Sequence, residues 1–367
     1  MLRLRQDARA PGERDQLVFE FKDPLLELVR LLREATEVEH ALLVQYLYAG
    51  FSVKPQYQGI VGSAFPVTAH NLLGVAVQEM QHLDDVNQML LAVGASPNLI
   101  RQDFPYQPTI YPFAFNLEPM SRESLAKYVW TEAPANDPFL EQLQPVLGEL
   151  RPNHLGSLYA TIISETEKLI ADPPSPDIDL TPWPAKLKFI KGEGEVAHFV
   201  FFKELFLGTH AGFGGLANVW DLAKDDPSYP ALDLQVNPTP FVTLPNTITD
   251  ETWAAIAWLS DLHYWITLVL LDIGYRYGSA TAMALAKSHM TGPLLMLGRH
   301  LATLGCGTPF DPLSVGYNLG HDREATKRLL GHLLAEAQAE TEALRSDLPA
   351  AFPFAQTPFT ISKLSQL

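Results

Sequence analysis

Two Glu-x-x-His pairs lie on apolar helical stripes in this sequence: Glu79 with His82, and Glu195 with His198. Residues three apart face the same side of a helix, so each pair presents a carboxylate beside an imidazole. Two such helices, together with one glutamate from each of two further helices, supply the ligands of dinuclear iron or manganese centres in four-helix bundles. Such a centre therefore requires two more glutamates on buried helical faces.

Glu39 is the first of these glutamates. It lies on a stripe with alternating spacings of three and four whose other members are apolar or amphipathic, namely Leu32, Ala35, Leu42, Tyr46 and Ala49. Burying an unpaired carboxylate is costly, so a carboxylate at a core position becomes neutral, pairs with another group or binds a metal. The position of Glu39 therefore predicts a metal ligand.

Glu165 is the candidate for the remaining glutamate, because it shares a stripe with Leu158, Ile162 and Leu169. Glu167 lies on a neighbouring stripe, and periodicity does not exclude it. Glu193 is likewise an alternative to Glu195 if the fourth helix begins late, after Gly194. The predicted ligand set comprises six residues: Glu39, Glu79, His82, Glu165, Glu195 and His198.

Carboxylates combined with imidazoles favour iron or manganese over zinc where oxygen ligands dominate. Bridging glutamates can hold two ions about 4 Å apart. We therefore expect two iron ions, with manganese as the alternative, and dioxygen and a small organic molecule as the substrates. Tyr46, two turns beyond Glu39, is predicted to act either as a catalytic group near the metals or as a core tyrosine.

The other histidines, among them His263 and His289, have no carboxylate at ligand spacing, so we expect them to be packed or on the surface. Cys306 is the only cysteine, which excludes an intrachain disulfide and a thiolate cluster. Neither feature suggests a second metal site.

The chain has 367 residues, of which 47% are apolar, and a formal charge of −16. This charge argues against nucleic acid or an anionic membrane as a partner. The start of the chain has no apolar segment typical of a secretory signal, and the longest apolar run is far shorter than the ~20 residues of a membrane helix. We therefore expect a cytoplasmic protein, and its large apolar helices hint at a homo-oligomer.

The pattern of periodic segments predicts an all-α fold, a four-helix bundle with additional C-terminal helices and long Pro-rich loops. We expect an N-terminal arm at 1–22, the bundle at 23–212, a Gly/Pro-rich connection at 213–250 and packed helices at 251–367. The predicted helices of the bundle are 23–51, 67–93, one beginning at Ser121, 153–171 and 193–207. Those of the C-terminal part are 250–277, 279–304 and 322–344. The aromatic stretch within 95–122 is expected to cover the bundle or to line a pocket.

The four helices resemble the ferritin-like superfamily, in which a Glu followed seven residues later by Tyr is common on the first helix, as with Glu39 and Tyr46. More narrowly, EHALLVQYLYAGFSV, QEMQHL, YATII and GEG shortly before HF are similar to the ferritin-like domain of iminophenyl-pyruvate dimer synthases. These are enzymes of the violacein and related bisindole pathways. With GPLLMLGRHLATLG and GTPFDP, the resemblance covers most of residues 24–315.

The resemblance implies a metal-dependent oxidoreductase of secondary metabolism acting on an amino-acid-derived imine or a similar compound. Two departures bear on the site. Glu193 and His198 are only five apart where family members often have a longer insertion, and Ser157 stands where an acidic residue is expected. The alternative functions are iron storage or detoxification, and a metal-free ferritin-like scaffold or binding protein.

Overall fold

Amphipathic and apolar helices form the protein. The computed structural model describes residues 20–63, 65–101, 113, 116–134, 137–147, 155–313 and 319–367. Within these residues, β-structure is limited to two isolated bridges, Val53 with Ala231 and Thr239 with Thr247. The predicted all-α class is confirmed.

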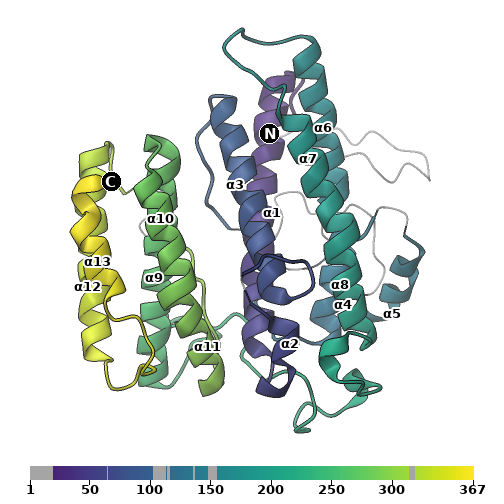
Figure 1. Ribbon diagram of the computed structural model, residues 1–367, viewed down its shortest axis with the longest axis vertical. Coiled ribbons are helices and arrows are strands. Elements are labelled where there is room, and N and C mark those ends of the chain that lie inside the picture. Colours follow the sequence, from purple (N-terminus) through teal and green to yellow (C-terminus); the bar gives the residue numbers. More distant parts are fainter. Residues whose placement is uncertain are drawn as a thin grey trace.

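Four rods of helix form the bundle, drawn in purple to teal in Figure 1. The first two rods are α1 (Pro24–Ser52) and α3 (Leu72–Ala92). The third rod consists of two separate helices, α4 (Arg122–Glu132) and α6 (Leu155–Ala171). The fourth rod is continuous and consists of α7 (Trp183–Gly192), a π-helix η3 (Glu193–His198) and α8 (Phe199–Leu207).

The contacts between these rods explain how the third rod is formed. α1 packs against α3 and α6, α6 packs against α7, and α4 packs against α8. Since α7 and α8 belong to one rod, α6 covers its first half and α4 its second half (Figure 1). The third helix of the bundle is therefore made of two separate segments of the chain.

Local capping residues determine where these helices begin. Asp23 accepts hydrogen bonds from the first turn of α1, as predicted, and Ser121 and Ser124 form a capping box at α4. Two predicted starts were wrong. α3 begins at Leu72, five residues late, because Asn71 caps it, and the fourth rod begins at Trp183, ten residues early, with Pro184 tolerated in its first turn.

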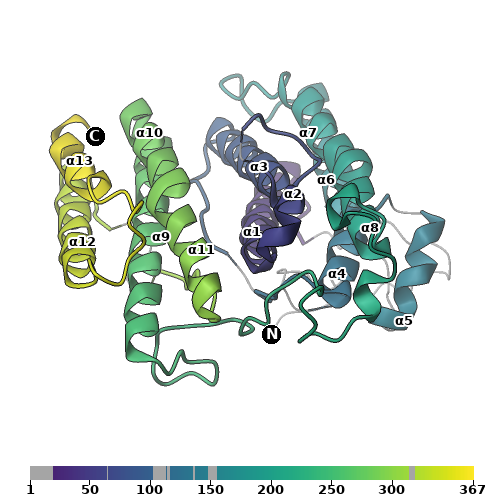
Figure 2. The ribbon, with the colours of Figure 1, turned by 60° about the horizontal axis from the view of Figure 1, so that its bottom comes forward.

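The C-terminal helices form a second group beside the bundle, as Figure 2 shows. They are α9 (Glu251–Tyr277), α10 (Ala280–His289), a π-helix η6 (Met290–Leu294), α11 (Leu295–Leu304), α12 (Arg323–Ala343) and α13 (Gln356–Lys363). α11 contacts α1, and α9 contacts α3, which joins this group to the bundle. The predicted helix at 279–304 is thus interrupted by η6, which contains Pro293.

Among the described helices, α9 alone is long and apolar enough to cross a membrane, yet 83% of its apolar window is buried inside the protein. This burial is typical of the core helix of a folded domain. Short helical turns complete the structure: η1 (Pro55–Tyr57), α2 (Gln58–Val61), η2 (Pro138–Leu143), α5 (Gln144–Leu147), η4 (Ala211–Phe213), η5 (Val219–Asp221) and η7 (Leu364–Gln366).

Two sequence predictions fall largely outside the described residues. They concern the N-terminal arm, of which residues 1–19 are not described, and the aromatic stretch, of which 102–112, 114 and 115 are not described.

Candidate metal centre

Glu79 occupies the middle of a buried cluster inside the bundle. Its Oε2 lies 2.8 Å from Nδ1 of His82, and its Oε1 lies 2.9 Å from Nδ1 of His198. Glu79 and His198 are fully buried, and His82 is almost so. One carboxylate on α3 therefore joins an imidazole of its own helix to an imidazole of η3.

The first half of the cluster consists of Glu39, Glu79 and His82, whose ligand atoms all lie within 4.8 Å of one another. Glu39 extends from α1 and places its Oε2 3.6 Å from Nδ1 of His82. The hydroxyl of Tyr159 on α6 donates a hydrogen bond to the other oxygen, Oε1. One oxygen of Glu39 is thus held by a tyrosine, and the other faces the cluster.

The second half consists of Glu79, Glu132 and His198, again within 4.8 Å of one another. Glu132 is the last residue of α4, and its Oε2 lies 3.7 Å from Nδ1 of His198. The hydroxyl of Tyr46 donates a hydrogen bond to Oε1 of Glu132. The two halves therefore have the same composition, share Glu79 and each use one tyrosine to hold the outer glutamate.

The atoms that face the interior of the cluster fit metal ions. Within the described part of the chain, Oε2 of Glu39 and Oε2 of Glu132 are buried and accept no hydrogen bond. A buried carboxylate oxygen left without a donor is costly, and a cation would satisfy both oxygens. Gly194 leaves room for one of these oxygens. A Cβ at this position would lie 2.8 Å from Oε2 of Glu132, so a larger residue would collide with it.

The outer nitrogens of the two histidines are also held. Nε2 of His82 lies 2.9 Å from Oε2 of Glu193, and Nε2 of His198 lies 3.1 Å from Oε1 of Gln78. The amide of Gln78 in turn donates to Glu193. Metal-binding histidines commonly donate the N–H of their far nitrogen to a carboxylate or carbonyl, which fixes the ring and leaves the near nitrogen free for the metal.

The π-helix explains why Glu193 takes this place. The N–H of Phe199 bonds to the carbonyl of Gly194, five residues earlier. With bonds of this span, residues five apart lie about one turn apart, so Glu193 and His198 both reach the cluster. Glu195, three residues before His198, forms an ion pair of 2.6 Å with Lys191 instead.

The carboxylates and imidazoles of the cluster shift one another's pKa values. Burial and the neighbouring Glu79 raise the pKa of Glu39 to about 8. Burial alone would lower the pKa of His198, but Glu79 and Glu132 raise it to about 10, and Glu79, Glu193 and Glu39 likewise raise that of His82. Burial would raise the pKa of Glu79, yet the two histidines lower it below its ordinary range. The protonated forms of the two histidines are therefore stabilised by the carboxylates around them.

Four of the six predicted ligands meet in this cluster, namely Glu39, Glu79, His82 and His198. Glu165 and Glu195 do not. Glu165 forms an ion pair of 2.5 Å with Lys168 on its own helix, and the alternative Glu167 pairs with Lys188. The structure places Glu132 where the prediction had Glu165, and favours Glu193 over Glu195 as a neighbour of the cluster.

The sequence contains a signal for Glu132 that the prediction did not use. Leu125, Tyr128, Val129 and Glu132 follow the spacing of three and four by which Glu39 was found, and all four are buried. Tyr46, predicted as a catalytic group or a core tyrosine, is fully buried and touches a candidate ligand.

A cavity of about 10 Å³ touches the cluster and is lined by residues that include His82, Glu132, Tyr159 and Gly194. A volume of this size accommodates about one water-sized molecule. Within the described residues, the centre is therefore closely surrounded by protein, as a site that excludes bulk water requires.

Comparison with known proteins agrees with this geometry. The ferritin-like family model matches residues 32–177, so this part of the chain is a ferritin-like domain. The match contains Glu39, Glu79, His82 and Glu132 and ends before His198.

A distant similarity extends to dichlorochromopyrrolate synthase of Lentzea aerocolonigenes, which is 31% identical over 130 residues. The similar region is 29% of this chain and only 13% of that synthase. No solved structure matches the chain. The resemblance noted in the sequence is confirmed at this level, as a ferritin-like domain with distant similarity to a synthase.

Proposed function

We propose that the protein is a dinuclear metal oxidoreductase, with two iron ions as the resident group, that acts on a small organic substrate. One observation carries this proposal: two buried Glu/His groups of equal composition share Glu79. Glu39, Glu79 and His82 would hold one ion, and Glu79, Glu132 and His198 the other. A pair of ferrous ions supplies two electrons for the reduction of dioxygen.

The residues around the cluster prepare it for this role. Tyr159 and Tyr46 fix one oxygen of each outer glutamate, so the other oxygen is directed inward. Glu193 and Gln78 hold the far nitrogens of His82 and His198 and thereby orient both rings. These contacts preorganise the ligands, which lowers the cost of assembling the centre.

The substrate class belongs to the same proposal. The resemblance of the sequence to iminophenyl-pyruvate dimer synthases favours an amino-acid-derived imine or a related compound, oxidised with dioxygen as the co-substrate. The distant similarity to dichlorochromopyrrolate synthase is consistent with a small organic substrate. The cytoplasmic location and the homo-oligomer stay predictions. Iron storage has no specific support in the structure, because the chain adds a second group of helices beside the bundle.

The test is metal content, measured by elemental analysis after anaerobic reconstitution with ferrous ion and removal of free metal. The protein is compared with Glu79→Gln and with the matched control Glu165→Gln, a buried glutamate outside the cluster. We expect about two ions per chain in the wild type and the control, and nearly none in Glu79→Gln, since Glu79 serves both halves.

Equal loss of metal in both variants would contradict the assignment of the cluster, and absence of metal in the wild type would overturn the proposal. Oxygen uptake by the loaded protein, with and without amino-acid-derived imines, then tests the reaction. Uptake that depends on both the imine and Glu79 is the expected result.

A further inference from the structure

A second, larger cavity lies between the bundle and the C-terminal helices. Its volume is about 450 Å³, and its walls come from α1, α3, α9, α10 and η6. Protein interiors contain few voids larger than a water molecule, and a cavity of about 150 Å³ is enough to bind benzene. This cavity therefore has the size of a small-molecule site.

This cavity is separate from the metal centre, although both use α1 and α3. On α3, Glu79 and His82 face the centre, whereas Val77, Met80 and Asp84 line the cavity. At about 100° per residue, these two sets point to nearly opposite sides of the helix. A molecule in the cavity is thus divided from the metal ligands by the helices themselves.

The interior of the cavity is apolar and adaptable. Its wall is formed mostly by aliphatic and aromatic side chains, together with three methionines, Met80, Met283 and Met290. Methionine side chains adjust to the shape of an apolar ligand and make favourable contacts with aromatic rings. The hydrophobic effect therefore favours transfer of an apolar body from water into this space.

Two hydrogen bonds engage polar groups of the cavity wall. The hydroxyl of Tyr264 lies 2.7 Å from Nε2 of His40, and burial lowers the pKa of His40 to about 3, so this imidazole is neutral. The hydroxyl of Tyr275 donates to Asp84 over 2.9 Å. Asp84 is the one carboxylate among the described lining residues, and its negative charge disfavours an anionic group close to it.

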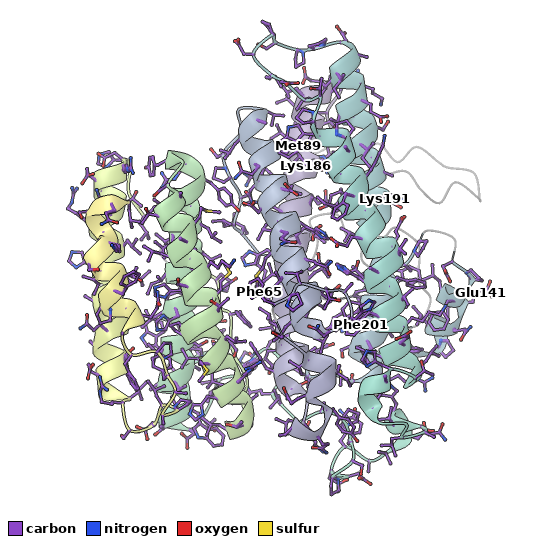
Figure 3. The ribbon with its side chains drawn as sticks, in the orientation of Figure 1. Phe65, Met89, Glu141, Lys186, Lys191 and Phe201 are labelled. Carbon is purple, nitrogen blue, oxygen red and sulfur yellow. The ribbon has the colours of Figure 1, made fainter. Side chains whose placement is uncertain are left out.

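The mouth of the cavity has a different character. Phe65, Gln81, Ala284 and Lys287 line the cavity and are also exposed to solvent, and Phe65 lies between the bundle and the C-terminal helices in Figure 3. The ammonium group of Lys287 lies 4.8 Å from the centre of the Phe65 ring. Within the described part of the chain it forms no ion pair with a carboxylate, and it is the only lysine or arginine among the lining residues.

We propose that this cavity binds an amphipathic organic acid, with the apolar body inside and the anionic group at Lys287. Two features support this class of ligand: a mostly apolar interior, and a lysine at the mouth that is the one lysine or arginine among the described lining residues of a chain whose net charge is −16. A fatty acid and an arylalkanoic acid share this chemistry. The site does not depend on metal in the bundle.

The test is isothermal titration calorimetry with decanoate, 3-phenylpropionate and 1-decanol on chelator-treated protein. We expect saturable binding of at least one of the two acids at about one molecule per chain, and weaker binding of the alcohol. Preference for decanoate identifies an aliphatic ligand, and preference for phenylpropionate an aromatic one. Failure of both acids to bind would overturn the proposal.

Two variants locate the ligand. Ala284→Trp fills the mouth from an exposed position, and Ala280→Trp, one turn earlier on α10, is the matched control because Ala280 is exposed but does not line the cavity. We expect at least a tenfold loss of acid binding in Ala284→Trp and none in Ala280→Trp. Equal binding by the two variants would overturn the location.

Lys287→Gln tests the anionic group without altering the cavity, and circular dichroism confirms that each variant is folded. It should weaken binding of the acid about tenfold and leave that of 1-decanol unchanged. If acid and alcohol respond equally, the pairing with Lys287 is wrong. Metal content and acid binding are separate measurements, so either proposal can fail without the other.

Discussion

His82 and His198 in the bundle, and His263 and His289 in the C-terminal helices, form two buried histidine pairs of similar shape. The ring centres lie 5.9 Å apart at an interplanar angle of 31° in the bundle, and 5.2 Å apart at 36° in the C-terminal pair. Their neighbours differ. Four carboxylates, those of Glu39, Glu79, Glu132 and Glu193, surround the first pair, whereas the second pair has a histidine–histidine contact and a threonine.

In the bundle, the neighbouring carboxylates reverse the effect of burial on the pKa of the histidines. Burial lowers the pKa of a histidine because it disfavours the charged ring, and in the C-terminal pair nothing opposes this effect, so that of His289 falls to about 4 and that of His263 is also low. In the bundle the carboxylates outweigh burial, and the pKa of His198 rises to about 10.

Hydrogen bonds also assign the tautomers of the C-terminal pair. Thr360 donates its hydroxyl hydrogen to the carbonyl of Gln356, so it accepts from Nε2 of His289 at 2.9 Å. Nδ1 of His289 is then an acceptor, and Nδ1 of His263, 3.0 Å away, donates to it. Two neutral rings are thus joined by one hydrogen bond, whereas the rings of the bundle pair contact carboxylates.

Removal of one ring from each pair should give the largest contrast. We expect His198→Ala to lower bound iron from about two ions per chain to one or none, because it removes a ligand of the second half. His289→Ala should leave metal content unchanged and destabilise the fold by about 3 kcal/mol, since it leaves a cavity and an unpaired donor.

Elemental analysis and urea unfolding of both variants measure this contrast. Loss of metal in His289→Ala, in a protein that remains folded, would show that the C-terminal histidine pair affects metal binding in the bundle, contrary to this expectation.

The pH dependence of stability should separate the pairs next. A group with a lowered pKa, such as His289, stabilises the fold in full above its unfolded value of about 6.5 and loses this contribution as the pH falls through about 4. The loss is on the order of 3 kcal/mol. His198, with a raised pKa, acts in reverse: its contribution is complete below about 6.5 and is lost as the pH rises through about 10.

Urea unfolding of chelator-treated protein between pH 4 and 10 tests both signs. The measured quantity is the free energy of unfolding as a function of pH. Relative to the wild type, His289→Asn should reduce the loss of stability at acidic pH, and His198→Asn should reduce the loss at alkaline pH. If His289→Asn changed stability at alkaline pH, or His198→Asn at acidic pH, the assigned protonation states would be refuted.

The first half of the cluster, formed by Glu39 on α1 and by Glu79 and His82 on α3, was predictable because both helices are continuous. A glutamate or histidine on a regular apolar stripe is buried, and Glu39, Glu79 and His82 are. Periodicity identifies a buried face but not the helix that packs against it. Glu165 is buried as expected, yet its carboxylate reaches Lys168, and the third rod is formed beside the cluster by α4.

The fourth rod was harder to predict for a different reason. The spacing rule of three and four assumes an α-helix, whereas η3 has bonds that span five residues. This shift brings Glu193 to His82 and turns Glu195 toward Lys191. Gly194, between these two glutamates, lies close to Glu132, and this tertiary contact between distant segments is not contained in any local pattern.

The smallest change that distinguishes the two regions is the removal of a single hydroxyl from each. Tyr46→Phe removes the donor to Glu132, so we expect iron to bind the second half about 10- to 100-fold more weakly. Tyr128→Phe serves as the control, because it removes a hydroxyl that donates to the carbonyl of Gln45 and keeps the ring that packs edge-on against Tyr46. Thr360→Val instead leaves the N–H of His289 unpaired and should cost about 1–3 kcal/mol of stability with metal affinity unchanged. Metal titration and urea unfolding of all three variants measure both quantities. If Tyr46→Phe changed stability alone, Tyr46 would be a core tyrosine, and the hydrogen bond would not serve the metal ligand.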